Sequence, residues 1–503
     1  MLSRSSFLAE GKAHFAKINY YLRGKAFADM WTLVLTWSAL AVYAVIVLST
    51  VLVVLLDNRQ PYKTIAWVVV LVLLPFVGLV FFYFFGQNIR KERYINRRNF
   101  RLLTEKMLAE HPGMHRDEFP SKYAPLISLF ERKHLSVATP GNEVRLLRSG
   151  RDFMHALLQD IGSAVHHIHV ETYIIEDDTA GRLLRDALAD AVRRGVTVRF
   201  IYDDVGCWNV PNDFFASFGR AGIEVQPFLP VRFPSLTHKV NYRNHRKVIV
   251  VDGRVGFIGG MNFANRYMER GGIEWRDLHM RLVGGAVATL QRNFLSDWHF
   301  VTDTLVTSAR CFPVIDIEPG RGALIQVVDS NPVSRYPEIM YGLTWAFQHA
   351  RKYLYIQTPY FMPTEPVLQA MQTAAMSGVD VRLMVPLKPD GFWLRWANDS
   401  YFAEVLLAGI RIFTFAPGFL HSKCVVMDDD YCSIGSSNMD FRSFENNFEA
   451  NAFIYDRATA LQVKEIFLND ERHCREVRLS EWMHRSYGRR LLESCTRILS
   501  PLL

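Results

Sequence analysis

The sequence predicts an α/β fold of two similar lobes, related by a pseudo-twofold axis, behind an N-terminal hairpin of two transmembrane helices. Three observations lead to this prediction. Two long uncharged stretches lie near the N-terminus, an order of strands and helices is duplicated, and a short polar cassette occurs once in each duplicate. Alternating strands and helices are typical of α/β domains, and an internal repeat of this length indicates two similar lobes.

The two uncharged stretches are residues 31–56 and 64–85. Both exceed the roughly 20 apolar residues that span a bilayer core of about 30 Å. A secretory signal would have a shorter apolar stretch and no second span. The connector, DNRQPYK, is short, so we expect a hairpin with both ends on one side of the membrane. Pro75 and Gly78 lie inside the second stretch, so we expect a kink there, which membrane helices tolerate.

Basic residues flank this hairpin. Lysines and arginines precede the first span, and the segment NIRKERYINRRNFR follows the second. Positive flanks stay in the cytoplasm, so we expect the remainder of the chain to be cytosolic. Residues 1–30 form either an amphipathic interfacial helix or a frayed leader, and residues 88–140 connect the hairpin to the first lobe.

The duplicated region begins at residue 141. IHVETYIIEDD at Ile168 and LYIQTPYFMP at Leu354 each begin a strand, helix, strand pattern, followed by a shorter copy, AGIEVQPF at Ala221 and AGIRIFTF at Ala408. The apolar periodicity changes from strand to helix and back in both copies. We therefore expect lobes at 141–310 and 311–485 with largely parallel sheets, and a C-terminal tail at 486–503.

Each lobe then reaches the same cassette: His, one residue, Lys, four residues, Asp, and later Gly-x-x-Asn or Gly-Ser-x-Asn. The first reads NHRKVIVVDGRVGFIGGMN from Asn244, and the second reads LHSKCVVMDDDYCSIGSSN from Leu420. A His and a Lys two residues apart on a strand leave the same face, as for His245 with Lys247 and His421 with Lys423. The aspartates lie at odd spacing, so we expect Asp252 and Asp428 to support a turn.

One His-x-Lys pair alone indicates little, because a lone histidine is usually structural. Two copies on related lobes would bring two imidazoles, two ammonium groups and the asparagines Asn262 and Asn438 to one interface. Such a site suits phosphate, because lysines supply positive charge, asparagines supply neutral donors, and one histidine can attack phosphorus while the other moves protons. We expect no metal and no other cofactor, because lysine is not a usual ligand and no second histidine stands at ligand spacing.

A nucleophilic histidine must present an unprotonated nitrogen, and a carboxylate on its other nitrogen holds that tautomer. Each half offers one candidate. Asp277 follows His245 by 32 residues, and Glu449 follows His421 by 28. An exposed surface charge is the alternative for both.

The bulk composition fits an anionic partner. The chain of 503 residues has a net charge of +8 and six cysteines without a CxxC pair. This charge suits nucleic acid, an acidic membrane surface or a phosphate substrate, although solubility alone would also explain it. We interpret the cysteines as reduced thiols on the cytoplasmic side.

The doubled HxKxxxxD motif with its downstream asparagines resembles the phospholipase D superfamily over residues of both lobes, about 140 to 480. Within this superfamily, the chain resembles bacterial cardiolipin synthases in three segments: PFVGLVFFYFFGQN, ETYIIEDD and the SPLL tail. The resemblance implies catalytic roles for the histidine, lysine and aspartate of each cassette: His245, Lys247, Asp252, His421, Lys423 and Asp428. It also implies that Asn262, Asn438, Asp277 and Glu449 bind the substrate phosphate or orient a histidine.

The resemblance further implies transfer of a phosphatidyl group between two phosphatidylglycerol molecules through a phosphatidyl-histidine, with release of glycerol and without a metal or nucleotide. It implies a multi-pass protein of the bacterial inner membrane, with a cytoplasmic catalytic part, that contacts anionic lipids and no nucleic acid. The alternatives are a phospholipase D hydrolase, phosphatidyl transfer to another alcohol such as serine or ethanolamine, a membrane-tethered nuclease and a non-catalytic scaffold.

Overall fold

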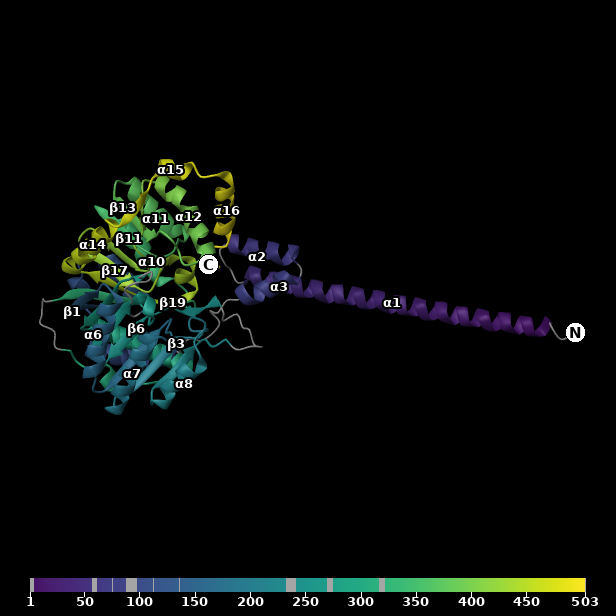
Figure 1. The fold of residues 1–503 in the computed structure, drawn as a ribbon, viewed down its shortest axis with the longest axis horizontal. Coiled ribbons are helices and arrows are strands. Elements are labelled where there is room, and N and C mark those ends of the chain that lie inside the picture. The colour runs from purple at the N-terminus through teal and green to yellow at the C-terminus, as the bar shows by residue number, and fades with distance from the viewer. Residues whose placement is uncertain are drawn as a thin grey trace. The chain divides into compact units, whose positions relative to one another are not determined.

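The computed structural model describes residues 4–56, 61–74, 76–86, 97–111, 113–134, 136–231, 241–268, 275–315 and 322–502. The chain divides into two compact units, Met1–Gln87 and Asn88–Leu503 (Figure 1), and each is described by itself. Residues 57–60 of the hairpin connector, Pro75, and most of the basic segment after the second predicted span lie outside the described residues.

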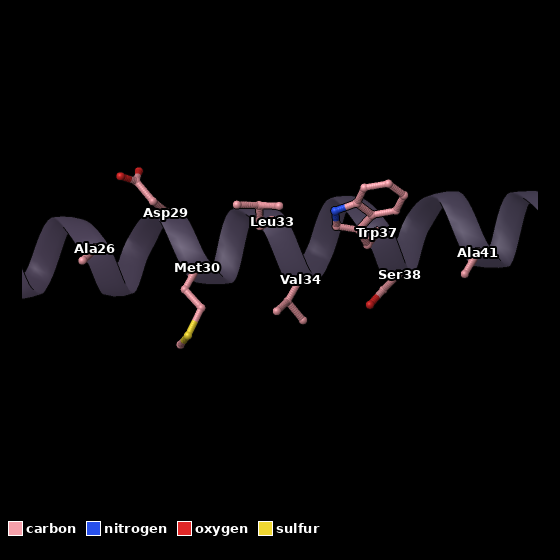
Figure 2. A pocket seen from close by; sticks show the side chains of 8 residues that line it. All are labelled: Ala26, Asp29, Met30, Leu33, Val34, Trp37, Ser38 and Ala41. Atoms are coloured by element: carbon pink, nitrogen blue, oxygen red, sulfur yellow. The ribbon is translucent and has the colours of Figure 1, made fainter.

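The N-terminal unit is dominated by one long helix, α1 (Arg4–Leu56), which runs unbroken from the leader into the first apolar stretch. Within the described residues, α1 is the one helix long and apolar enough to cross a membrane. Figure 2 shows side chains such as Leu33 and Trp37 projecting from it, and these two are 59% and 66% exposed. Such a surface suits contact with lipid tails.

The second predicted span is not one continuous helix. It comprises α2 (Pro61–Leu73), α3 (Val77–Phe81) and a π-helical turn at Phe82–Gly86. The break falls beside Phe76, which has a φ of +60°, and the Phe76 ring lies 4.7 Å from that of Tyr43 on α1. The break lies where Pro75 and Gly78 predict a kink, and the two-helix hairpin stays a prediction.

The second unit is built on one 16-stranded sheet. The principal strands of the first half are β1 (Ala138–Leu147), β2 (His167–Thr172), β3 (Thr197–Asp203), β4 (Glu224–Phe228), β6 (Val248–Val251), β7 (Val255–Gly259) and β9 (His279–Val283). Those of the second half are β10 (Ala323–Ser330), β11 (Tyr353–Gln357), β13 (Asp380–Pro386), β14 (Arg411–Phe415), β16 (Cys424–Met427), β17 (Tyr431–Gly435), β19 (Asn447–Tyr455) and β20 (Cys474–Val477).

Short strands and the helices complete this unit. The short strands are β5 (Arg243–Asn244), β8 (Trp275–Arg276), β12 (Phe361–Met362), β15 (Phe419–Leu420) and β18 (Met439–Asp440). The helices are α4 (Arg97–Glu110), α5 (Ala124–His134), α6 (Gly150–Ser163), α7 (Thr179–Arg193), α8 (Asn212–Arg220), α9 (Ala286–Thr302), α10 (Glu338–His349), α11 (Glu365–Met376), α12 (Phe392–Leu407), α13 (Phe441–Glu445), α14 (Arg457–Glu471), α15 (Leu479–Met483) and α16 (Tyr487–Ile498).

The strand order is duplicated, as the sequence predicted. The first half runs β4-β3-β2-β6-β7-β9-β1, the second runs β14-β13-β11-β16-β17-β19-β10, and β1 pairs with β10 between them. β20 adds one strand beyond β14; apart from it, the order of corresponding strands is the same from either end. A pseudo-twofold axis through the β1–β10 pair would produce this palindrome.

The prediction of largely parallel sheets is wrong. Only β2-β3-β4 and β11-β13-β14 pair in parallel along the main path, and the central ladders are antiparallel. The cause lies in the cassettes, because β6 turns directly into β7 and β16 into β17. A tight turn joins antiparallel strands, whereas a parallel pair needs a long crossover.

The core joins the two halves through the cassette strands. Val248 and Ile258 of the first half belong to the same buried cluster as Val426 and Ile434 of the second. Helices such as α7 and α8 cover the sheet of the first half on its outer side, and α11 and α12 cover that of the second (Figure 1). The cassette strands therefore lie at a buried boundary between the halves.

Candidate active site

Both histidines lie in extended segments immediately before the cassette strands, not on the strands themselves, which begin at Val248 and Cys424. Each is fixed by the backbone of the opposite half. The amide of His245 donates to the carbonyl of Phe448 at 2.9 Å, and the amide of His421 donates to the carbonyl of Arg276 at 2.7 Å. The short parallel pairs β5–β19 and β15–β8 align these segments.

The acid partner of each histidine also comes from the opposite half. His245 Nδ1 lies 3.0 Å from Oε1 of Glu449, and His421 Nδ1 lies 2.6 Å from Oδ2 of Asp277. The sequence predicted both carboxylates as partners but associated each with the histidine that precedes it in its own half. The structure crosses the pairs, so each half contributes the histidine of one pair and the acid of the other.

All four members of the crossed pairs are buried, and burial dominates their protonation. Burial and the charge of Lys247 lower the pKa of His245 to about 4, against the attraction of Glu449. Burial, Lys423 and Lys247 lower the pKa of His421 well below its usual value. Both imidazoles are therefore neutral at pH 7 in the free protein, as a nucleophile or general base requires.

The two carboxylates differ from each other. Burial raises the pKa of Asp277 to about 6, opposed by Lys423 and by a hydrogen bond from the amide of Leu278. Burial acts on Glu449 in the same direction, but attraction to His245 and Lys247 and a hydrogen bond from the Ser436 hydroxyl lower its pKa overall. The His421–Asp277 pair thus keeps a proton to higher pH than the His245–Glu449 pair.

Each lysine folds back beside its own histidine. Lys247 Nζ donates to the carbonyl of His245 at 2.7 Å, and Lys423 Nζ donates to the carbonyl of His421. Burial and the charge of the other lysine lower the pKa of Lys247 well below its usual value, and burial lowers the pKa of Lys423 to about 8. Two buried ammonium groups that repel each other form a site that an anion would stabilise.

The two asparagines lie in the loops after the cassettes and are engaged with the protein. Asn262 accepts from the amide of Ile174 at 3.1 Å and donates to the Tyr267 hydroxyl at 2.7 Å. Asn438 donates to Asp440 at 3.1 Å, while its own buried carbonyl oxygen has no partner among the described residues. Neither amide is recorded in contact with a cassette histidine or lysine in the described chain.

The two aspartates act on the backbone and lie away from the imidazoles. Asp252 accepts hydrogen bonds from the amides of residues 165, 166 and 167 at 2.7–2.9 Å. Asp428 accepts from the amides of residues 351, 352 and 353 at 2.8–3.3 Å. Both stand at positive φ in the turn after the cassette strand. Gly253 follows at +66°, where a Cβ would lie 2.5 Å from the carbonyl of Cys311.

We predict that Asp252→Asn lowers stability more than it lowers activity. Asparagine tolerates positive φ, so the change isolates the loss of the carboxylate charge. Losing charge-assisted hydrogen bonds should cost about 1–3 kcal/mol of unfolding free energy. Chemical unfolding of the full chain measures the first effect, and the rate at a temperature below unfolding measures the second. Normal stability together with total loss of activity would contradict the prediction.

Several aromatic and polar residues of the site carried no sequence signal. The Tyr267 hydroxyl lies 3.4 Å from His421 Nδ1, the Tyr173 ring centroid lies 4.9 Å from that of His245, and the Trp275 centroid lies 4.9 Å from that of His421. Ser436 donates to Glu449. Tyr173 falls inside ETYIIEDD, where only the family resemblance could have drawn attention to it.

A further missed residue is Arg246, between His245 and Lys247. It is fully buried and forms ion pairs with Asp297 at 2.5 Å and Asp329 at 3.4 Å, and its Nε donates to the carbonyl of Glu449. The alternation of side chains along an extended segment turns it away from the two residues that flank it. It therefore fixes the cassette against the opposite half.

The arrangement can stabilise and transfer a phosphoryl group. It supplies two oriented imidazoles for nucleophilic and acid–base steps and two buried lysines for the charge of the phosphate. Within the described residues, no group of three or more histidines, cysteines, aspartates and glutamates is placed to hold a metal ion.

Comparisons with known proteins show the family of the chain. A family model described as "Cardiolipin synthase, PLD-like domain" matches residues 157–298 and 343–471, and one described as "Phospholipase_D-nuclease N-terminal" matches residues 39–87. The chain is 38% identical to cardiolipin synthase 2 of Bacillus anthracis over 459 residues, covering 90% of this chain and 89% of that protein. It is 36% identical to a cardiolipin synthase of Alkalihalophilus pseudofirmus, with 100% of both chains covered.

Among solved structures, the phosphatidylserine synthase of Haemophilus influenzae superposes with a TM-score of 0.56. It covers 72% of this chain and 95% of its own, at 16% identity. This similarity concerns the fold alone.

Proposed function

The chain belongs to the cardiolipin synthase family with phospholipase D-like domains, and from this membership we propose how its crossed histidines carry out the reaction. It is a membrane-bound phosphatidyltransferase that makes cardiolipin and glycerol from two phosphatidylglycerol molecules. The observation that carries the proposal for the site is the pair of buried imidazoles, each held by a carboxylate from the opposite half beside a buried lysine.

In the first step, Nε2 of His245 attacks the phosphorus of one phosphatidylglycerol. A nitrogen–phosphorus bond forms, and the bond from phosphorus to the headgroup glycerol oxygen breaks. Glu449 holds the proton of His245 on Nδ1 and so keeps Nε2 free. His421 donates a proton to the departing glycerol oxygen, and Lys247 and Lys423 balance the charge on the phosphate oxygens.

The difference between the two pairs supports this division of roles. Glu449 is the carboxylate with the lowered pKa, which favours a neutral His245 with its proton on Nδ1. Asp277, with a pKa of about 6, and His421 share a proton more readily. A bound phosphodiester anion would raise the proton affinity of this pair further and make it the general acid.

In the second step, His421 takes the proton from a hydroxyl of the second phosphatidylglycerol. That oxygen attacks the phosphatidyl-histidine, the nitrogen–phosphorus bond breaks, and cardiolipin forms. Asn262 acts through Tyr267 on His421, Asn438 orders the loop after the second cassette through Asp440, and Asp252 and Asp428 keep the cassette turns in place.

For the membrane arrangement, we propose that α1 and the segment Pro61–Gly86 cross the bacterial cytoplasmic membrane as a hairpin. The exposed basic residues Lys12, Lys17, Arg23 and Lys25 precede the apolar part of α1 and support a cytoplasmic N-terminus. The catalytic part, with lobes at 141–310 and 311–485, then lies on the cytoplasmic side.

The protonation of Lys423 predicts an alkaline limit on activity. Its pKa of about 8 lies below the usual value, so the cation is present below pH 8 and is lost as the pH rises through 8. We expect kcat/KM for phosphatidylglycerol in mixed micelles to fall above about pH 8, and the fall to move to higher pH in Lys423→Arg, which stays charged. A flat profile up to pH 9.5 in the wild type would contradict this role for Lys423.

A product assay tests the proposed reaction. Purified protein in detergent is supplied with phosphatidylglycerol alone, and the lipids are resolved by mass spectrometry. We expect cardiolipin and glycerol in equal amounts. Accumulation of phosphatidic acid in place of cardiolipin would show that water is the acceptor.

A further inference from the structure

We propose that the outer face of α16, together with the arginine-lined groove between α12 and α16, binds anionic phospholipid at the bilayer surface. This surface is separate from the histidines and would hold the catalytic unit against the membrane. The proposal rests on the chain being a membrane protein, but it does not depend on which phosphatidyl transfer the site performs.

The helix α16 turns its charged side toward the protein and its apolar side outward. Its inward face carries ion pairs: Glu493 is buried and is bound by Arg485 and Arg489, at 2.9 Å each, and Arg489 also contacts Asp399 at 2.9 Å. These contacts fix the orientation of the helix. A surface helix ordinarily buries its apolar side, so the outer face of α16 needs an explanation.

That outer face is an apolar stripe. Tyr487, Leu491 and Ile498 are 85%, 67% and 78% exposed, and Cys495 between them is exposed as well. The spacing of four, four and three residues keeps them in line along the helix. Arg490 and Arg497 flank the stripe along one side. A helix with an apolar stripe bordered by basic residues is typical of one that lies in the membrane interface.

The groove beside this stripe has the chemistry of an anion site. Its volume is about 330 Å³, and its lining includes Arg485, Arg490 and Arg497 with the hydroxyls of Ser400 and Ser494, against one carboxylate, Glu493. Arg485 and Arg497 are held by Glu493 and Glu404. No carboxylate of the described residues is recorded in an ion pair with Arg490. Arginine recognises phosphate with several donors at once.

An aromatic patch continues the surface from α16 toward the catalytic site. Phe392 and Trp393, at the start of α12, are 65% and 52% exposed. Their neighbour Trp396 lies 6.1 Å from Phe392 and under the guanidinium of Arg489 at 5.8 Å, which links the patch to α16. Exposed tryptophan and phenylalanine are typical of the interface between lipid tails and headgroups.

A series of contacts connects this patch to His421. Asp390, two residues before Phe392, accepts from the hydroxyl of Tyr360, whose ring lies 6.4 Å from that of Phe419. The Phe419 ring in turn lies 5.9 Å from that of His421. A bilayer bound on the patch would thus lie at the outer end of the contacts that lead to His421.

Lipid is the occupant that all these features favour together. A protein partner would suit the apolar stripe, but the stripe, the basic groove and the aromatic patch form one surface on a unit that α1 tethers to a membrane. Charge complementarity selects an anionic lipid.

The native Cys495 provides a direct test with the full chain. In a Cys474→Ser background, every cysteine other than Cys495 is buried. An environment-sensitive fluorophore can therefore be attached at Cys495. The labelled protein is then reconstituted in nanodiscs of phosphatidylglycerol and phosphatidylcholine. We expect brominated phosphatidylglycerol to quench it strongly. The control is Val165→Cys with Cys495→Ser, because Val165 is exposed near the turn after β6, at the opposite end of β2 from the site.

Quenching at 495 no stronger than at 165 would overturn the proposal. So would a label that is shielded from aqueous iodide but not quenched by bromolipid, because protein would then cover the helix. Arg490→Gln should weaken the quenching by brominated phosphatidylglycerol, and unchanged quenching in this variant would remove the groove from the site.

A kinetic comparison gives a second readout. The double variant Leu491→Ser/Ile498→Ser loses two apolar side chains that would insert into the bilayer surface. Its rate of cardiolipin formation on phosphatidylglycerol vesicles should therefore fall roughly 10-fold or more. The rate in mixed micelles should not change, and that rate also reports correct folding. Val165→Ser is the matched control. Equal rates of variant and wild type on vesicles would contradict the proposal. A wild type that makes no cardiolipin would refute the proposed function but leave the quenching test intact.

Discussion

Replacing either His245 or His421 by alanine is expected to abolish turnover, with a loss of roughly 10⁵- to 10⁶-fold in kcat, as for other catalytic groups that act as one unit. The reason is that each histidine acts in both half-reactions: His245 forms and releases the phosphoryl bond, while His421 gives and then takes the proton. Initial rates of cardiolipin formation in mixed micelles measure the effect. His166→Ala, at an exposed histidine outside the site, is the control.

A variant of either histidine with a near-normal rate would contradict the two-histidine scheme. The roles can be separated with a phosphatidyl ester of p-nitrophenol, a leaving group that departs without a proton. His421→Ala should release p-nitrophenol in a first-turnover burst, because its nucleophile is intact. His245→Ala should show no burst, and a burst in that variant would reverse the assignment.

Glu449→Gln is expected to lower kcat by about 10⁴-fold, the loss seen when the corresponding acid of a catalytic triad becomes an amide. The amide can donate to Nδ1 of His245, which moves the imidazole proton to Nε2 and removes the attacking lone pair. Asp277→Asn should act in the same way on His421. Glu143→Gln, at an exposed glutamate on β1, controls for the substitution itself.

Chemical unfolding of Glu449→Gln separates this effect from misfolding. The variant should remain folded, because glutamine preserves shape and can accept from Ser436. A folded variant with more than a tenth of the wild-type rate would show that Glu449 does not set the tautomer of His245.

The chemistry of the site could be predicted from the sequence because it is local. His245 and Lys247 are two residues apart on an extended chain, and the Asp-Gly pair at 252 requires a turn, so parity and turn chemistry place them. The repetition of this pattern at His421 predicted a shared site. The duplicated strand order followed from the same repeat.

The crossing of the acid partners could not be predicted, because it depends on long-range pairing. Asp277 follows β8, which pairs with β15 of the other half, and Glu449 lies on β19, which pairs with β5. Nothing near either acid in the sequence encodes that exchange. The antiparallel centre of the sheet was missed for a related reason: alternation of helix and strand ends at β4 in the first half and at β14 in the second, before the cassette strands.

The π-helical turn at Phe82–Gly86 and the buried Arg246 were missed for another reason. Hydropathy describes the composition of a segment but not its backbone, so a π-helical turn leaves no apolar signature. Arg246 appears in sequence as one more basic residue, whereas the structure surrounds it with Asp297 and Asp329.

The central claim is a covalent phosphatidyl-histidine that any fitting hydroxyl can intercept, and the most direct measurement is exchange with glycerol. The purified protein is incubated with cardiolipin and labelled glycerol, and the label is followed into phosphatidylglycerol. Because the phosphodiester bonds broken and made are alike, the reaction should run backward as glycerol rises. We predict label in phosphatidylglycerol in proportion to glycerol concentration, and none with His245→Ala. No incorporation while forward synthesis proceeds would contradict the covalent mechanism.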